Sequence, residues 1–136
     1  PELTAVDNVA LPLLLAGTAR GEARERAGAW LERFGVRGQE EQRPGELSGG
    51  QAQRVSLARA LVTGPRVVFA DEPTGALDSL ASEQVMAALV HTARESGTSV
   101  LLITHDAQTA AYADREVTLE DGVVVSGAEA PLGVSR

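Results

Sequence analysis

The sequence predicts an α/β domain built on a mainly parallel sheet, and three observations support this fold class. Two short, continuous apolar runs with β-branched members, residues 67–70 and 99–104, are typical of buried parallel strands. Segments with the apolar periodicity of helices precede, separate and follow these runs. An Asp-Gly pair at residues 121–122 separates two further β-prone segments and predicts a C-terminal β-hairpin, 116–120 with 123–126.

Two helices are predicted in the first third of the chain. Thr4 is a candidate N-cap for the first helix, and Pro12 predicts that this helix ends or bends next to it. The second helix is expected over residues 21–34, with a mixed-charge outer face. We expect its aromatic residues, Trp30 and Phe34, to pack in the core rather than to stack on bases.

The remaining helices alternate with breakers. Glycine and proline predict a loop over residues 35–46. A third helix is expected from residues 48–51 to about residue 61, and a fourth from about residue 80 to residue 95. Met86 lies on the inward stripe of the fourth helix and is expected to fill the core. A short helix is predicted over residues 107–113.

Composition narrows the class of protein. The chain has 136 residues, of which 43% are hydrophobic, so it corresponds to one domain or to part of one. Its net charge of −7 disfavours non-specific binding to nucleic acid or anionic lipid. The absence of cysteine excludes disulfides and thiolate metal sites. The longest apolar run, residues 10–16, is far shorter than the roughly 20 residues of a membrane-spanning helix. We expect neither a membrane span nor a nucleic-acid partner.

A polar, glycine-bearing turn leads directly into the third helix. Its residues are Leu47, Ser48, Gly49, Gly50 and Gln51. Such a turn can bind phosphate, because the first amides of a helix lack intrahelical acceptors and the helix dipole favours an anion. The glycines let an anion approach the backbone without meeting a Cβ atom. Taken alone, the same pattern also describes a helix cap and a turn.

Polar residues follow both predicted parallel strands. Asp71 and Glu72 come directly after the first strand, and His105 follows the second. Open α/β sheets place their ligands at the carboxyl ends of strands, so these side chains are expected at one end of the sheet. An isolated Asp-Glu pair is commonly surface charge, and an isolated histidine after a strand is commonly structural. The continuous apolar strands before them favour a catalytic site here.

Two segments, in this order and at this spacing, resemble the motifs of ABC-type ATPases. Residues 47–55 (Leu-Ser-Gly-Gly-Gln-Ala-Gln-Arg-Val) resemble the signature motif, and residues 67–72 (Val-Val-Phe-Ala-Asp-Glu) resemble the Walker B motif. The resemblance covers residues 3–127 and implies a P-loop NTPase fold of the ABC type, present as a fragment. Residues 70–78 are similar to the branch that includes lipoprotein-release and macrolide-export ATPases.

The resemblance divides the chain into three parts. Residues 1–46 are similar to the α-helical subdomain, in which residues 4–9 resemble the segment just after the Q-loop. Residues 47–127 are similar to the signature helix and an incomplete catalytic α/β core. Residues 128–136 are expected to form a frayed tail.

The resemblance also implies roles for residues at the ends of the strands. Asp71 would hold Mg²⁺ through water, and Glu72 would orient or deprotonate the attacking water. His105 matches the switch histidine, which contacts the γ-phosphate in this family. Asp78 occupies the loop that crosses the interface between two such domains, although an aspartate here is equally suited to capping the next helix. His91 is assigned no role.

A dimer and a membrane partner are implied as well. In this family two domains associate head to tail with two ATP molecules between them. Ser48, Gly49 and Gly50 would then contact the γ-phosphate of ATP held by the opposite subunit, and Gln51 belongs to the same ATP-binding segment. The helical subdomain would contact transmembrane permease subunits. The expected location is cytoplasmic, peripheral on the inner face of the cell membrane.

Three features of the family are expected to precede residue 1: the aromatic residue that stacks on adenine, the Walker A loop (P-loop) and the Q-loop glutamine. A P-loop needs a lysine, and all twelve basic residues here are arginine. The chain also begins with Pro1 and not with methionine. We expect a piece of a longer ATP-hydrolysing transport protein, inactive by itself. We also expect the missing Walker A strand to lie between segments 67–70 and 99–104, so that both present unpaired edges.

Two other functions remain open. One is an ABC-type ATPase that acts in DNA repair, on chromosomes or on ribosomes. Chromosome and repair members insert a long coiled coil, for which the 46 residues before the signature segment leave no room. The other is a non-catalytic interaction module that presents its signature face to the ATP of a partner.

Overall fold

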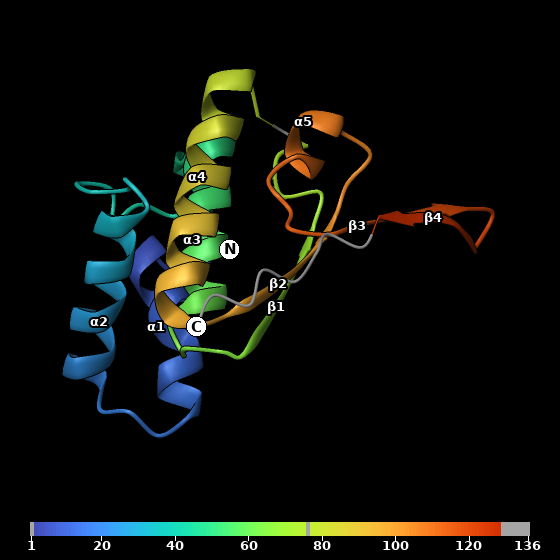
Figure 1. The fold of residues 1–136 in the computed structure, drawn as a ribbon. Coiled ribbons are helices and arrows are strands. Elements are labelled where there is room, and N and C mark those ends of the chain that lie inside the picture. Colours follow the sequence, from blue (N-terminus) through green and yellow to red (C-terminus); the bar gives the residue numbers. More distant parts are fainter. Residues whose placement is uncertain (1, 76, 129–136) are drawn as a thin grey trace.

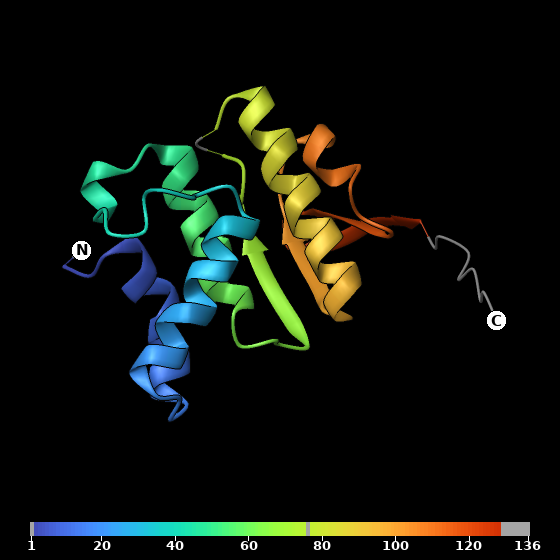
Figure 2. The ribbon, with the colours of Figure 1, turned by 90° about the vertical axis from the view of Figure 1, so that its left-hand side faces the viewer.

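The fold has three layers, which Figures 1 and 2 show from two sides. The computed structural model describes residues 2–75 and 77–128. The outer layer consists of two helices, α1 (Ala5–Leu15) and α2 (Arg20–Arg33). The middle layer consists of α3 (Gly49–Leu61) and α4 (Ser79–Ser96), and the third of β1 (Val67–Asp71) and β2 (Ser99–Ile103). The shorter elements are η1 (Pro44–Glu46), α5 (Ala107–Ala110), β3 (Glu116–Glu120) and β4 (Val123–Ala128).

Helix α1 begins as the sequence predicts and ends later. Thr4 is its N-cap, and the Thr4 side chain accepts a hydrogen bond from the amide of Asp7. The helix does not end next to Pro12, one of the two outcomes that the sequence predicts, because α1 continues to Leu15. Proline removes one backbone donor from a helix interior. The turn after it nevertheless forms because Leu13 is buried in the core, only 3% exposed.

Helix α2 buries one aromatic residue fully and the other in part. Phe34, at the C-cap of α2, is 3% exposed, which confirms its place in the core. Trp30 is only partly buried, so the prediction holds less well for it. Its ring stacks on Phe34 at 6.2 Å between centroids, and the Arg33 guanidinium lies over it at 5.4 Å.

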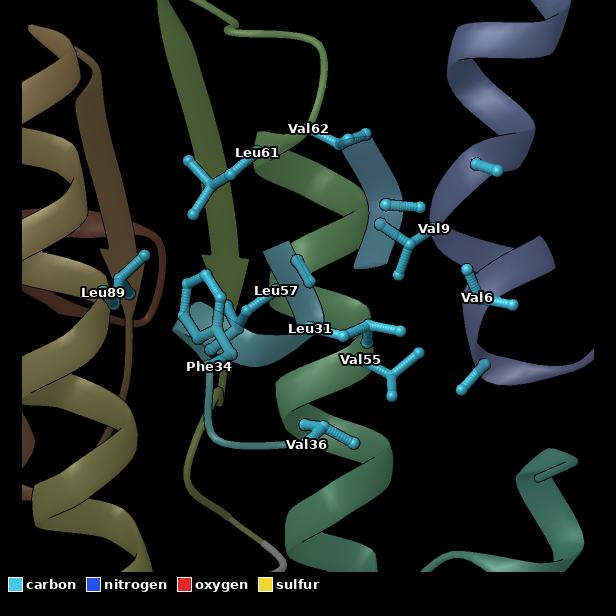
Figure 3. Packing of buried hydrophobic residues seen from close by; sticks show 14 of the residues in the cluster. Val6, Val9, Leu31, Phe34, Val36, Val55, Leu57, Leu61, Val62 and Leu89 are labelled. Carbon is cyan, nitrogen blue, oxygen red and sulfur yellow. The ribbon is translucent and has the colours of Figure 1, made fainter. Parts of the chain in front are cut away.

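The main core lies between the outer and middle helices (Figure 3). α1 contributes Val6 and Val9, and α2 contributes Leu31. α3 and α4 supply further buried residues, which include Val55, Leu57, Leu61, Met86 and Leu89. Met86 is 2% exposed, as expected for a residue that fills the core.

Strands β1 and β2 form a parallel pair. The register runs from Val67 opposite Ser99 to Asp71 opposite Ile103. Hydrogen bonds extend the ladder beyond both ends, from the Ser99 amide to the Arg66 carbonyl and from the Glu72 amide to the Ile103 carbonyl, each 2.9 Å long. This pairing leaves no space for another strand, so the prediction of a Walker A strand between the two segments is wrong.

One face of the parallel pair is buried in β1 and partly buried in β2, and the other face is exposed. Val68 and Ala70 are buried beneath the helices, whereas Phe69 is 73% exposed. The prediction of fully buried strands is therefore wrong for the described residues. Within residues 2–75 and 77–128 the sheet has two strands, so each has one unpaired edge. The expected unpaired edges were those facing the missing strand, and these edges instead pair with each other.

The remaining elements follow the sequence closely. Helix α4 ends at Gly97, whose φ of 66° gives a left-handed C-cap. Helix α5 is shorter than the predicted 107–113. Strands β3 and β4 form the predicted antiparallel hairpin, which extends away from the helices (Figure 1). Its turn residues, Asp121 and Gly122, both have positive φ, as a two-residue turn of this kind requires.

Two further expectations concern the membrane and the tail. In the part of the chain that the structure describes, no helix is both long and apolar enough to span a bilayer. The expected frayed tail covers residues 128–136, of which 129–136 lie outside the described residues. Residue 128 is the last residue of β4.

Truncation of Leu31 is expected to destabilise the helical core strongly. Leu31 is fully buried, so Leu31→Ala leaves a cavity and should lower the free energy of unfolding by about 2–5 kcal/mol. The same change at Leu15, which is 81% exposed, should have little effect. Urea denaturation of the domain that contains this chain measures both. Equal effects of the two variants would contradict the packing described.

Candidate functional site

The carboxyl ends of β1 and β2 bring the predicted catalytic residues together. Asp71 is the last residue of β1 and lies opposite Ile103, the last residue of β2. The next residues along each strand therefore meet at the same edge of the sheet. The side chains of Glu72 and His105 are in direct contact there, as the strand-end argument predicts.

Glu72 has an unusual backbone conformation. Its φ is 45°, in a region that residues with a Cβ atom rarely adopt and that costs roughly 1–3 kcal/mol. Two backbone hydrogen bonds hold the residue in place: its amide donates to Ile103, and its carbonyl accepts from Gly75 at 3.1 Å. The chain reverses sharply at this point, and the Glu72 side chain reaches the end of β2.

Three donors from the end of β2 surround the Glu72 carboxylate. Oε1 accepts from the His105 backbone amide at 3.1 Å and lies 2.7 Å from His105 Nδ1. Oε2 accepts from the Thr104 hydroxyl at 3.3 Å. An ionised carboxylate can only accept, so Nδ1 of His105 carries the proton in this pair. The other ring nitrogen, Nε2, is left for contacts outside the pair.

The pair is electrostatically complementary. The hydrogen bond from His105 holds the pKa of the Glu72 carboxyl below its usual value, and the same bond raises the pKa of the imidazole. The His105 side chain is 88% exposed and that of Glu72 38%, so water screens the attraction. The geometry thus favours an ionised carboxylate beside the Nδ1–H of the imidazole, with the His105 ring accessible to a ligand.

Asp71 offers one carboxylate at the exposed end of β1. In the described residues, no group of three or more His, Asp or Glu side chains could hold a metal without other ligands. Mg²⁺ is commonly bound by one or two carboxylates together with water and substrate phosphates. Asp71 therefore fits Mg²⁺ only as one ligand among several.

The signature segment forms a capping box at the start of α3. The Ser48 hydroxyl accepts from the Gln51 amide at 3.2 Å, and the Gln51 side chain accepts from the Ser48 amide at 2.8 Å. The reading of this segment as a helix cap is thus confirmed. The Gln51 amide is bonded to Ser48. The first-turn amides that remain free are therefore those of Gly49 and Gly50. None of the described residues accepts from them.

Gly50 is not needed for packing within the described residues. A Cβ atom at Gly50 would lie 3.5 Å from Leu77 Cδ2 and 3.9 Å from Ala81 Cβ, which are ordinary contact distances. The lack of a side chain here therefore does not serve the contact with α4. A close approach of a ligand to the backbone remains a physical reason for glycine at this position.

Asp78 caps the neighbouring helix. Its Oδ1 accepts from the Ala81 amide at 2.8 Å, which confirms the capping interpretation. Helices α3 and α4 lie side by side and begin at the same end of the molecule, the upper end in Figure 2. Arg54 of α3 donates to Gln84 of α4 at 2.6 Å. Strands β1 and β2 also end on this side (Figure 2).

The structure adds four residues around the pair that sequence reasoning did not identify. They are Thr74, Thr104, Asp106 and Thr109, which form hydrogen bonds around Glu72 and His105. Asp106 had a visible signal, because an aspartate before a short helical segment is a typical N-cap. The three threonines, of which Thr74 and Thr109 are buried, had no such signal. His91, assigned no role, interacts with Glu95 one turn away.

Comparisons with known proteins agree with this geometry. A family model described as ABC transporter matches residues 1–75. The chain is 50% identical over 131 residues to the macrolide export ATP-binding/permease protein MacB of Chromobacterium violaceum, across 96% of this chain and 20% of that protein. It is 44% identical over 129 residues to the lipoprotein-releasing system ATP-binding protein LolD of Hyphomonas neptunium, across 95% of this chain and 57% of LolD.

A solved structure matches the fold directly. The ATP-binding cassette MJ0796, in a dimeric post-hydrolysis state bound to ADP and Pi, aligns with a TM-score of 0.86 and 38% identity. The alignment covers 96% of this chain and 58% of the cassette chain. The chain belongs to the ABC transporter family. The P-loop NTPase fold and the resemblance to the lipoprotein-release and macrolide-export branch are confirmed. The chain spans about a fifth of MacB and little more than half of LolD.

Removal of the Ser48 hydroxyl is expected to weaken α3. Ser48→Ala removes the acceptor for the Gln51 amide and should lower the free energy of unfolding by about 1 kcal/mol. Ser56→Ala is a matched control, because the Ser56 hydroxyl only donates back to the Ala52 carbonyl in the same helix. Urea denaturation followed by circular dichroism compares the two. A larger loss for Ser56→Ala would contradict the capping box.

Proposed function

We propose that the protein containing this chain hydrolyses ATP to drive transport across a membrane. The observation that carries the proposal is the contact between Glu72 and His105 at the carboxyl end of a parallel strand pair. Family membership supports it, and so do the printed names of the relatives, an export protein and a lipoprotein-releasing system. These names favour transport over the roles in DNA repair, on chromosomes or on ribosomes.

Three residues at the strand ends are assigned to hydrolysis. Asp71 would hold Mg²⁺ as one ligand among water and phosphate oxygens, and the bound ion would offset the negative charge of the phosphates. Glu72 orients or deprotonates the attacking water, a role that its ionised carboxylate suits. His105 directs Nε2 or its proton toward the γ-phosphate while Nδ1 holds Glu72.

The helix starts are assigned to ATP bound by a second subunit. The free amides of Gly49 and Gly50 suit an anion, and the positive end of α3 reinforces the attraction. Ser48 and Gln51 preserve the shape of this turn through the capping box. Asp78, at the start of the adjacent helix, would contact the opposite subunit in a head-to-tail dimer, a state that the dimeric cassette structure supports.

The assembly would place the protein at a membrane. Residues 1–46 are proposed as the part of the helical subdomain that contacts transmembrane permease subunits, and residues 47–127 as the signature helix and catalytic core. The location that follows is cytoplasmic, peripheral on the inner face of the cell membrane. The printed name of MacB, which joins ATP-binding and permease functions, supports a permease partner.

Glu72→Gln in the full-length protein is expected to abolish ATP turnover. The amide cannot accept a proton, so turnover should stop. It keeps the size of the side chain, so ATP-driven dimerisation should persist. Glu83→Gln is the control, since Glu83 is exposed on α4 and forms no hydrogen bond or ion pair with Glu72 or His105. Phosphate release and sedimentation in ATP measure the two effects. Normal turnover by Glu72→Gln would remove the proposed role.

His105→Ala is expected to lower the turnover rate by about two orders of magnitude or more. The change removes the donor that holds Glu72 and the ring that faces the ligand. The chain offers an internal control, because His91→Ala alters the only other histidine, which is exposed and in mid-helix. Steady-state ATPase rates test the pair. Turnover near wild type for His105→Ala would exclude His105 from the mechanism.

The isolated 136-residue chain is expected to be marginally stable. Four large apolar residues on the open face of β1 and β2 are about half exposed or more: Val67, Phe69, Leu101 and Ile103. We propose that polypeptide outside this chain covers this face, because a contiguous patch of exposed apolar side chains favours association. Sedimentation and thermal melting of the isolated chain should show self-association and weak cooperativity. A stable monomer would contradict the proposal.

A further inference from the structure

A buried pair of hydroxyls links the two segments that carry Glu72 and His105. Thr74 lies in the turn after Glu72, and Thr109 lies in α5, which follows His105. The two residues are 7% and 2% exposed, and their Oγ1 atoms are 3.0 Å apart. Buried hydroxyls are costly unless they are hydrogen-bonded, and within the described residues the Thr74 hydroxyl has Thr109 as its partner.

The direction of the hydrogen bonds can be derived. The Thr109 hydroxyl lies 2.6 Å from Oδ2 of Asp106. Hydrogen bonds from Thr109 hold the pKa of the Asp106 carboxyl below its usual value, so Asp106 is ionised and can only accept. The single O–H of Thr109 therefore donates to Asp106. It follows that the Thr74 hydroxyl donates to Thr109, and that the path runs from Thr74 through Thr109 to Asp106.

The same aspartate is joined to Glu72 on its other side. The Asp106 amide donates to the Thr104 hydroxyl at 3.1 Å, and that hydroxyl donates to Oε2 of Glu72 at 3.3 Å. The hydrogen bonds thus run from Glu72 through Thr104, Asp106 and Thr109 to Thr74. Because Thr74 follows Glu72 by two residues, the backbone closes this path into a loop. His105 lies between Thr104 and Asp106, so its backbone is held on both sides.

We propose that Thr109 is a positioning residue that keeps His105 against Glu72. It acts through Asp106 and Thr74 and contacts no reacting atom. The inference rests on the proposed ATP hydrolysis at this site and assigns a role to a residue outside the known motifs.

Other constraints on the pair are weak. Helix α5 has only four residues, and a helix of that length is not stable by itself. The His105 side chain is 88% exposed, so packing does not fix it. Glu72 is held in a backbone conformation that favours glycine. The hydrogen bonds through Thr109 therefore fix the position of His105, which core packing does not do at this edge of the sheet.

The test compares three variants of the full-length protein. Thr109→Val keeps the shape of the side chain and removes the hydroxyl, and Thr109→Ser keeps the hydroxyl. Thr98→Val is the matched control: Thr98 is 8% exposed, and its hydroxyl donates to the Pro65 carbonyl at 2.8 Å, near the opposite ends of the strands. We expect Thr109→Val to lower kcat at least about tenfold with KM for ATP near wild type, because positioning errors act on the chemical step. Thr109→Ser should recover most of the rate.

Amide hydrogen exchange supplies a readout that is independent of activity. Thr109→Val should speed exchange in residues 104–110, whereas Thr98→Val should speed it near residues 65 and 99. If Thr109→Val does not fold, Thr74→Val breaks the same contact from the other side and leaves the bond between Thr109 and Asp106 intact. It should lower kcat in the same way, to a smaller extent.

The outcomes separate this inference from the proposed function. A kcat within about twofold of wild type for Thr109→Val, or a loss no greater than that of Thr98→Val, overturns the positioning role. Failure of Thr109→Ser to recover the rate also overturns it. ATP turnover by the wild-type protein in the same assay reports on the function itself, and Glu72→Gln reports on the role of Glu72. If Glu72→Gln loses turnover while Thr109→Val does not, only the inference about Thr109 fails; if the wild-type protein shows no ATP turnover, the proposed function fails.

Discussion

The parallel pairing of β1 with β2 is the constraint on which the site depends. The register sets Asp71 opposite Ile103, so the residues that follow each strand must meet. A shift of one residue along either strand would separate Glu72 from His105, because a step along a strand is about 3.3 Å. The hydrogen bond from the Glu72 amide to Ile103 continues the ladder into the turn and fixes where the chain reverses. The contact between the two side chains proposed for catalysis is thus a direct consequence of backbone pairing.

The starts of two helices form the second part of the proposed site. α3 and α4 begin at the end of the molecule where the strands end (Figure 2), and each is capped by its own side chain. These caps satisfy some amides of the first turn and leave those of Gly49 and Gly50 free. A single hydrogen-bond pattern therefore stabilises the helix and leaves two amides for the anion contact proposed above. The capping and phosphate-binding interpretations of the signature segment are compatible.

Much of this arrangement could be predicted from the sequence, and the failures have physical causes. The positions of Glu72 and His105 followed from local pattern, since apolar runs define strands and strands of one direction end together. The order of the strands could not be derived from local pattern, because strand pairing joins segments that are distant in the chain and apolar periodicity does not encode the pairing. Phe69 was expected to be buried because continuous apolar runs reflect burial on both faces, and the described residues cover only one. Thr109 carried no signal, because a buried hydroxyl is recognised only once its partners are placed.

A double-mutant cycle on Glu72 and His105 tests the central claim most directly, namely that the two side chains act as one unit held by the strand pair. The residual single-turnover rates of Glu72→Gln, His105→Ala and the double variant would be measured in the full-length protein. Residues that act as a unit are strongly non-additive, so the double variant should be no slower than the slower single variant, within about threefold. Rate losses that multiply, as for independent sites, would contradict the account.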